Sequence, residues 1–145
     1  MVVRFGGRAV LDGLSLQAAT GALTAVLGAN GAGKTTLVRC CTDLIRPAAG
    51  TVTVLGLPAG SRQLAARIGL MPQSAGSWSG IKTIELLRYL AGLYANPLPV
   101  PPLVERLGLT DCAKVPYRRL SGGQQQAVNL AGALVGRPEL IFLDE

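Results

Sequence analysis

The sequence predicts an α/β fold with a mainly parallel central sheet flanked by helices. Three apolar runs suggest the strands of this sheet, at residues 23–27 (LTAVL), 68–71 (IGLM) and 140–143 (LIFL). Short apolar runs of this kind are typical of strands buried on both faces. Segments with helical spacing lie between them, and this alternation is the pattern of α/β proteins. With 145 residues, 49% of them hydrophobic, the chain can bury a sizeable core.

The first predicted unit is a strand, a glycine-rich loop and a helix. The strand at 23–27 runs into the loop, whose sequence is GANGAGKTT. After the loop, apolar residues recur at helical spacing until Arg46 and Pro47 end the helix. Cys41 falls within this spacing, so we expect its thiol on the buried face, where it acts as a small hydrophobic group.

The rest of the chain predicts short strands around a helical insert. We divide it into a core of residues 1–73, a helical part of residues 74–120 and a last segment, 121–145, with a helix and a strand. Ser121 suits the N-cap of that helix. The expected elements are a strand at 51–55, a short helix at 61–67, a strand at 68–71, a helix at 83–94, a hinge at 97–102, a short helix to Gly108, a helix at 121–135 and a strand at 140–143.

Charge and composition exclude several classes of protein. The net charge is +6, and residues 1–73 carry seven basic against two acidic side chains, which indicates either an anionic ligand or a solvated basic face. No basic cluster with interleaved aromatic residues supports nucleic-acid binding. The chain has no histidine, which excludes Ser-His and Cys-His hydrolase chemistry, and its three cysteines form no metal-binding pattern. No apolar stretch approaches the roughly 18 residues of a membrane span, so we expect a soluble, cytosolic protein.

The strongest chemical signal is the pattern G-x-x-x-x-G-K-[ST] between a predicted strand and a predicted helix. Its glycines let backbone N–H groups wrap a phosphate chain, and the helix N-terminus adds the positive end of a dipole. Lys34 is expected to reach the β and γ phosphates, Thr35 to bind Mg²⁺ and Thr36 to contact the α phosphate. The alternative is a purely structural glycine turn. The expected phosphate-binding residues are Gly28, Asn30, Gly31, Ala32, Gly33, Lys34, Thr35 and Thr36.

A second glycine-containing segment, LSGGQ at residues 120–124, has two interpretations. It can be a capped helix start with two flexible glycines. It can also be a second phosphate grip, in which the hydroxyl of Ser121, the amides of Gly122 and Gly123 and the helix dipole all face a γ phosphate. Two such grips in one chain require two ligands, or two copies that share one.

Two carboxylates follow the last apolar run. Asp144, at the end of a buried strand, is placed to hold Mg²⁺ through its water shell. The neighbouring Glu145 can polarise an attacking water as a general base. The alternative is that both are solvated acids at the end of the chain.

With these motifs in place, the chain resembles the nucleotide-binding domain of ABC transporters over essentially its whole length. Residues 28–35 look like Walker A, Met71-Pro72-Gln73 like the Q-loop, LSGGQ like the signature and LIFLDE like Walker B with its catalytic glutamate. The resemblance implies a P-loop nucleoside triphosphatase core in residues 1–73 with an ABC-type helical subdomain after it. Its details look closest to multidrug or ABC-2 type exporters.

The resemblance also implies roles for further residues. Phe5 would stack on adenine, although a lone strand Phe is often a core residue. Gln73 would contact Mg²⁺ or the attacking water and relay the nucleotide state to a membrane partner. The second grip, formed by Ser121, Gly122, Gly123 and Gln124, would close over MgATP bound to a second ATPase subunit.

The implied protein is an ATPase subunit that works with integral membrane permease subunits on the inner face of the cell membrane. ATP and Mg²⁺ are its implied cofactors. The family continues beyond Glu145 into a D-loop and a switch histidine, so we expect the chain to be C-terminally incomplete and, as it stands, impaired in hydrolysis. Ala127 departs from the arginine that is common in the family at that position.

Three other functions are to be weighed against that of a transporter ATPase. A non-transport ABC ATPase that acts on DNA or the ribosome would share every motif, but heptads between Gln73 and Leu120 and a charged interdomain linker are lacking. A remnant that binds nucleotide without hydrolysing it is also consistent. A GTPase would need the guanine-reading pattern Asn-Lys-x-Asp, which does not occur.

Overall fold

A computed structural model describes residues 1–73 and 80–144. The chain divides into two compact units, Met1–Leu64 and Ala65–Glu145, and each is described by itself. In the described residues, no helix has the length and apolar character needed to cross a membrane.

The first unit contains a β-hairpin that the sequence analysis did not predict. Strands β1 (Val3–Phe5) and β2 (Arg8–Leu11) pair antiparallel. The two-residue turn between them, Gly6-Gly7, has φ values of 53° and 82°, which glycine adopts without strain. Val3 and Leu11 of the hairpin are buried against α1 (Lys34–Cys41).

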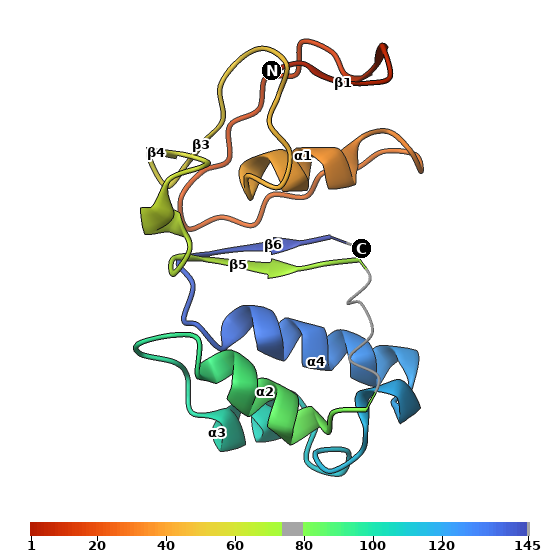
Figure 1. The fold of residues 1–145 in the computed structure, drawn as a ribbon, viewed down its shortest axis with the longest axis vertical. Coiled ribbons are helices and arrows are strands. Elements are labelled where there is room, and N and C mark those ends of the chain that lie inside the picture. The colour runs from red at the N-terminus through yellow and green to blue at the C-terminus, as the bar shows by residue number, and fades with distance from the viewer. Residues whose placement is uncertain (74–79, 145) are drawn as a thin grey trace. The chain divides into compact units, whose positions relative to one another are not determined.

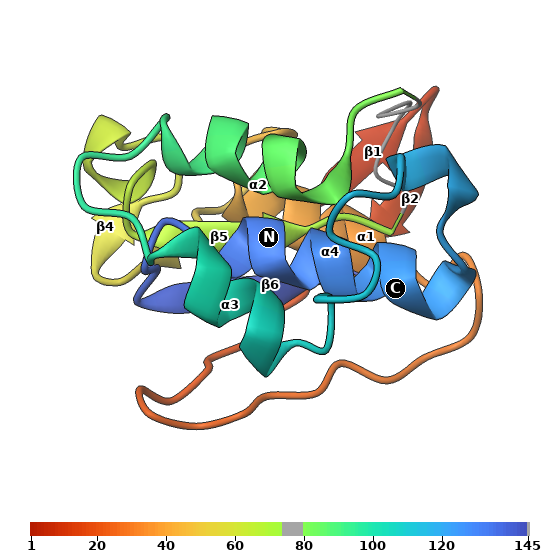
Figure 2. The same cartoon turned by 90° about the horizontal axis from the view of Figure 1, so that it is seen from below.

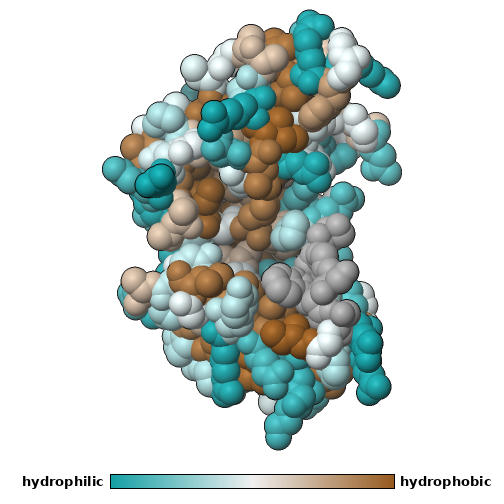
Figure 3. All heavy atoms as spheres, viewed as in Figure 1, coloured by the Kyte–Doolittle hydropathy of each residue, from teal (hydrophilic) through white to brown (hydrophobic). Residues whose placement is uncertain are grey.

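The expected strand at residues 23–27 is wrong. These residues lie in an extended loop, with Leu23 94% and Leu27 91% exposed. A strand needs a hydrogen-bonded neighbour on at least one edge, and no described strand pairs with this segment. Hydrophobic atoms are visible on the surface of this unit (Figure 3).

Helix α1 is shorter than predicted. It ends at Cys41, because Asp43 adopts a left-handed conformation (φ 56°) and the Thr42 hydroxyl donates to the carbonyl of Val38 at 3.0 Å. Cys40, not Cys41, takes the fully buried position, since the helix starts at Lys34 and turns residues 37 and 40 inward. Burial raises the pKa of both thiols, so both stay protonated at neutral pH.

Two further elements of this unit are shorter than predicted. The strand expected at 51–55 is reduced to β3 (Thr53–Val54), which forms a tight hairpin with β4 (Leu57–Pro58). The helix expected at 61–67 is a single 3₁₀ turn, η1 (Arg62–Leu64). The positive φ of Leu55 (50°) and Gly56 (76°) forms the turn that ends β3.

The second unit is built on the two strands that the sequence placed correctly. Strand β5 (Ile68–Met71) pairs parallel with β6 (Leu140–Leu143), in register from Ile68 opposite Leu140 to Met71 opposite Leu143. Helix α4 (Gly122–Leu134) lies along this pair (Figure 1). Gly69 makes the close packing possible, because a Cβ there would collide with the carbonyl oxygen of Ala133.

Three helices and a short turn enclose the core of this unit. Figure 2 shows α2 (Thr83–Ala91) and α3 (Val100–Arg106) gathered with α4, and η2 (Tyr117–Arg119) leads into α4. Helix α3 begins inside the expected hinge, since prolines at its first turn have no N–H to lose there. The fully enclosed side chains of this core include Leu86, Leu87, Leu109, Val128, Ala131 and Val135.

Candidate functional site

The glycine loop reaches α1 through a backbone that only glycine allows. Gly31 and Gly33 have φ values of 80° and 95°, in the left-handed region. A Cβ on Gly33 would lie 2.6 Å from Leu11 Cδ2 and 3.2 Å from the carbonyl oxygen of Val10. The loop is thus held against the β1–β2 hairpin, and its last glycine is the N-cap of α1.

Lys34 is the first residue of α1, and its side chain folds back over the loop. Its Nζ donates to the carbonyl oxygens of Gly28 at 2.8 Å and Ala29 at 3.0 Å. The N–H groups of Lys34 and Thr36 fall in the first helical turn, where an α-helix supplies no acceptor of its own. The N-cap residue, Gly33, has no side chain that could cap this end, so backbone donors and the Lys34 ammonium group lie at the same helix terminus.

This arrangement fits the phosphates of a nucleotide. The first-turn donors, the helix dipole and Lys34 all favour negative charge, and the glycines leave the backbone free of side chains. Asn30 and Ala32 lie in the same loop, where the Ala32 N–H closes a turn on the Ala29 carbonyl at 3.1 Å.

Phe5 is a surface residue. It ends β1 and is 48% exposed, so the interpretation as a core side chain is wrong. The adjoining strand β2 contacts both α1 and the glycine loop, which places Phe5 on the hairpin that supports that loop.

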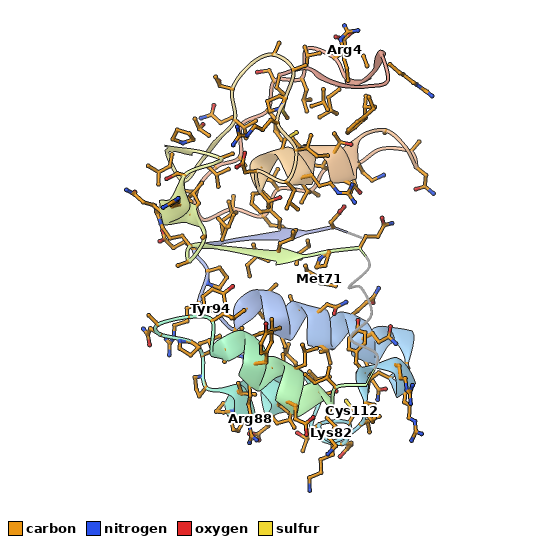
Figure 4. The ribbon with its side chains drawn as sticks, in the orientation of Figure 1. Arg4, Met71, Lys82, Arg88, Tyr94 and Cys112 are labelled. Carbon is orange, nitrogen blue, oxygen red and sulfur yellow. The ribbon has the colours of Figure 1, made fainter. Side chains whose placement is uncertain are left out.

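The second unit brings Gln73 and Asp144 together. Asp144 follows β6, and its N–H donates to the carbonyl of Met71, the last residue of β5, at 2.9 Å. Gln73 and Asp144 line one cavity of about 440 Å³ between the strand ends and α4. Met71 lies on the α4 side of β5 in Figure 4. Other lining residues are Gln126, Ala127, Asn129 and Leu143, whereas Glu145 lies outside the described residues.

Ser121 caps α4 as predicted. Its Oγ accepts from the Gln124 N–H at 3.3 Å, and its own N–H donates to Gln124 Oε1 at 2.9 Å. Gly122 and Gly123 open the helix and are exposed, with nothing within 4 Å of where a Cβ would lie. The capping interpretation is therefore confirmed, and the backbone beside Ser121 is open to solvent.

The sequence analysis missed the contacts that hold this helix start. Tyr117 donates from its hydroxyl to Asn129 Oδ1 at 3.0 Å, and Gln125 reaches back to the preceding turn. The sequence held one signal for these contacts. Asn129 is a polar residue among the apolar residues of α4, and such a residue usually needs a hydrogen-bond partner. The expected absence of a cysteine metal site stays a prediction, although the described residues include no group of three metal-binding side chains.

The predicted residues form two groups, one in each unit. Lys34, Thr35 and Phe5 belong to the first unit, while Asp144 and Ser121 belong to the second. Thr35 belongs to the first unit and Gln73 and Asp144 to the second, so their common role as magnesium ligands stays a prediction.

The chain is similar to known proteins over both of its units. Residues 11–145 match a family model described as ABC transporter. The daunorubicin resistance ATP-binding protein DrrA3 of Streptomyces coeruleorubidus is 40% identical, over 98% of this chain and 47% of its own length. The Nod factor export ATP-binding protein I of Sinorhizobium fredii is 37% identical, over 97% of this chain and 43% of its own. The zinc import ATP-binding protein ZnuC of Pseudomonas putida is 36% identical, over 99% of this chain and 52% of its own length.

Solved structures give the same result for the fold. The structure of cbiO1 from Clostridium perfringens, described as part of the ABC transporter complex cbiONQ, superposes with a TM-score of 0.80. It is 26% identical, and the match covers 99% of this chain and 62% of that one. The chain thus spans about half the length of the curated relatives that it matches.

Proposed function

The chain belongs to the ABC transporter family of ATP-binding proteins, and on that premise we propose that the whole protein binds MgATP and hydrolyses it to drive transport. The α/β fold of P-loop nucleoside triphosphatases is shared with its solved relatives. The proposal extends the family membership to catalysis, to the coupling with membrane subunits and to the direction of transport.

One observation carries the nucleotide-binding part of the proposal. The glycine loop delivers Lys34 to the N-terminus of α1, and the Lys34 ammonium lies 2.8 Å from a loop carbonyl. A polyphosphate entering the loop would meet this ammonium and the first-turn N–H groups together. Phe5, exposed on the adjoining hairpin, offers an aromatic face for the adenine ring.

The oxygen donors of the chain suit Mg²⁺. Hydroxyl and carboxylate oxygens are the ligands that this hard cation prefers, and Thr35 and Asp144 would supply them, with Gln73 beside Asp144 in the same cavity. Bound Mg²⁺ would neutralise charge on the phosphates. Glu145 would orient and polarise the attacking water, while Lys34 would neutralise the phosphate oxygens.

The signature segment supports a shared site between two copies. Ser121 and the exposed amides of Gly122 and Gly123 form a second helix start that suits an anion. We propose that this segment closes over the ATP of a second ATPase subunit, and that integral membrane permease subunits complete the complex at the inner face of the membrane. The description of cbiO1 as part of a transporter complex supports the latter.

We propose export as the direction of transport. Its support is the Nod factor export ATP-binding protein I, which is 37% identical to this chain. The zinc import relative represents the competing direction at slightly lower identity. ATP-dependent accumulation of substrate in inside-out vesicles would support export, and accumulation only in right-side-out vesicles would contradict it.

The test of the core proposal uses the protein as its gene encodes it. We expect magnesium-dependent ATP hydrolysis that is lost in Glu145→Gln, with the variant retained as an ATP-bound dimer on size-exclusion chromatography. Ser121→Ala should lower hydrolysis without changing the affinity of the monomer for ATP. A wild-type protein that neither binds nor hydrolyses MgATP would contradict the proposal, and binding without turnover would favour the nucleotide-binding remnant.

A further inference from the structure

A network of polar contacts fixes the turn that precedes Ser121. Gln125 Nε2 donates to the carbonyl oxygens of Tyr117 at 3.4 Å and Leu120 at 3.2 Å, so α4 holds the preceding turn η2 by its backbone. The Tyr117 hydroxyl reaches one helical turn further and donates to Asn129 Oδ1 at 3.0 Å. The turn η2, which directly precedes Ser121, is therefore bonded to α4 at two positions, Gln125 and Asn129.

The other side of η2 is anchored to the start of α2. The Tyr117 N–H donates to the carbonyl of Ile81 at 2.9 Å, and the Thr83 N–H donates to the carbonyl of Val115 at 3.1 Å. The Thr83 hydroxyl, fully buried, donates to the same Val115 carbonyl at 3.3 Å. The Tyr117 backbone is thus bonded on both sides, by its N–H to Ile81 before α2 and by its carbonyl to Gln125 of α4, while its side chain is bonded to Asn129 of α4.

Stability alone does not account for the Tyr117–Asn129 pair. Tyr117 is only 6% exposed and belongs to the apolar core of its unit. A phenylalanine would fill the same space, and an apolar residue could face it from α4. The bond is partly buried, and replacing both partners of such a bond by apolar groups of similar shape is often nearly neutral for stability. The hydrogen bond between the Tyr117 hydroxyl and the Asn129 amide instead fixes the orientation of η2 on α4.

We propose that Tyr117 and Asn129 are positioning residues for the signature segment. Their hydrogen bond holds η2 on α4, so that Ser121 and the amides of Gly122 and Gly123 meet an incoming phosphate in one orientation. Without it, Gln125 still joins the η2 backbone to α4, but the Tyr117 side chain loses its fixed position on that helix. The inference rests on the proposed function, because it assigns the pair to the anion-binding helix start.

The experiment compares three variants of the protein as its gene encodes it. Tyr117→Phe and Asn129→Leu each break the hydrogen bond, and the double variant Tyr117→Phe/Asn129→Leu replaces both partners. Steady-state kcat and KM for MgATP are measured with the thermal midpoint Tm and the Kd of the monomer for ATP. We expect each single variant to lower kcat/KM by about threefold to tenfold, with the monomer Kd unchanged.

Two results separate positioning from packing. The double variant should keep a Tm close to that of the wild type yet lose no more activity than the worse single variant. Wild-type kcat/KM in Tyr117→Phe and in the double variant, with Ser121→Ala impaired, would overturn the inference and leave the proposed function intact. Wild-type kinetics in Ser121→Ala itself would instead overturn the proposed function of the signature segment.

Discussion

Arg67 and Glu139 form a two-pronged ion pair across the start of the parallel strands. The guanidinium donates from Nε to Oε1 at 2.6 Å and from its terminal nitrogen to Oε2 at 2.9 Å, between residues 72 positions apart. The Glu139 N–H also donates to the Arg67 carbonyl at 2.7 Å. These contacts fix the register in which β5 and β6 begin, and that register places Asp144 opposite the end of β5.

The ion pair predicts a pH dependence of stability. Hydrogen bonds from Arg67 lower the pKa of Glu139 from its ordinary 4.5 and raise the pKa of Arg67. Because the carboxyl binds its proton more weakly when folded, its contribution is present above pH 4.5 and is lost as pH falls through the lowered value. Arg67 stays charged throughout.

We therefore expect Glu139→Gln to lower the urea midpoint at pH 7, with a difference from the wild type that shrinks as the pH falls below 4.5. The effect at pH 7 is expected to be small and to shrink in salt, since both side chains reach solvent. Glu105→Gln, an exposed acid on α3, is the matched control. A difference between Glu139→Gln and wild type that is as large at pH 3 as at pH 7 would contradict the assignment.

Gly69 provides a test of the packing of α4 on β5. An added methyl group would collide with the Ala133 carbonyl and approach Pro138 Cγ to 3.1 Å. We expect Gly69→Ala to destabilise the fold by about 1–3 kcal/mol, as overpacking of a core typically does. Gly80→Ala, which meets nothing within 4 Å, is the control in the same unit. Equal midpoints of chemical unfolding for the two variants would show that the helix can move away.

The parts of the fold that sequence predicted best have local causes. Ile68–Met71 and Leu140–Leu143 are unbroken apolar runs with turn residues on both sides, and each strand partners the other. The start of α4 at Ser121 follows from the capping chemistry of serine and Gln124. In each case the residues that form the element also supply its main stabilising contacts.

The misplaced elements depend on distant partners or on turn geometry. An apolar run such as residues 23–27 becomes a strand only when a neighbouring strand supplies hydrogen bonds. The sequence of the run does not indicate which segment that neighbour would be. The β1–β2 hairpin, by contrast, had a readable signal in Gly6-Gly7 between two short runs. The polar Asn129 among apolar residues of α4 was a signal for a hydrogen bond, but its partner Tyr117 could not be predicted, because the pairing depends on how η2 folds back on α4.

The exposed Phe5 allows the contribution of the adenine base to nucleotide affinity to be measured separately from that of the phosphates. If the exposed ring stacks on adenine, Phe5→Ala should weaken ATP binding about tenfold, in line with base–aromatic stacking. Binding of inorganic tripolyphosphate should not change, and Phe5→Tyr should behave as the wild type. Titration calorimetry of the two ligands checks this, with Leu44→Ala as an exposed apolar control in the same unit. An equal loss for both ligands would place the effect in the loop and not at the base.

Lys34 permits two explanations that one pair of variants can separate. Its Nζ donates to the carbonyls of Gly28 and Ala29, so it could serve only to hold the loop, or it could supply charge to a phosphate. Lys34→Gln keeps amide donors near the loop but removes the charge, whereas Lys34→Ala removes both.

We expect both Lys34 variants to lose at least about tenfold in MgATP affinity, because charge-assisted hydrogen bonds to phosphate are lost in each. Their unfolding midpoints should stay close to that of the wild type, since both hydrogen bonds that Lys34 Nζ makes within the described residues go to an exposed loop. Lys114→Gln, an exposed lysine of the second unit, is the control in calorimetry. Full affinity in Lys34→Gln would show that the lysine only holds the loop, and unchanged affinity in Lys34→Ala would remove the phosphate site from this loop altogether.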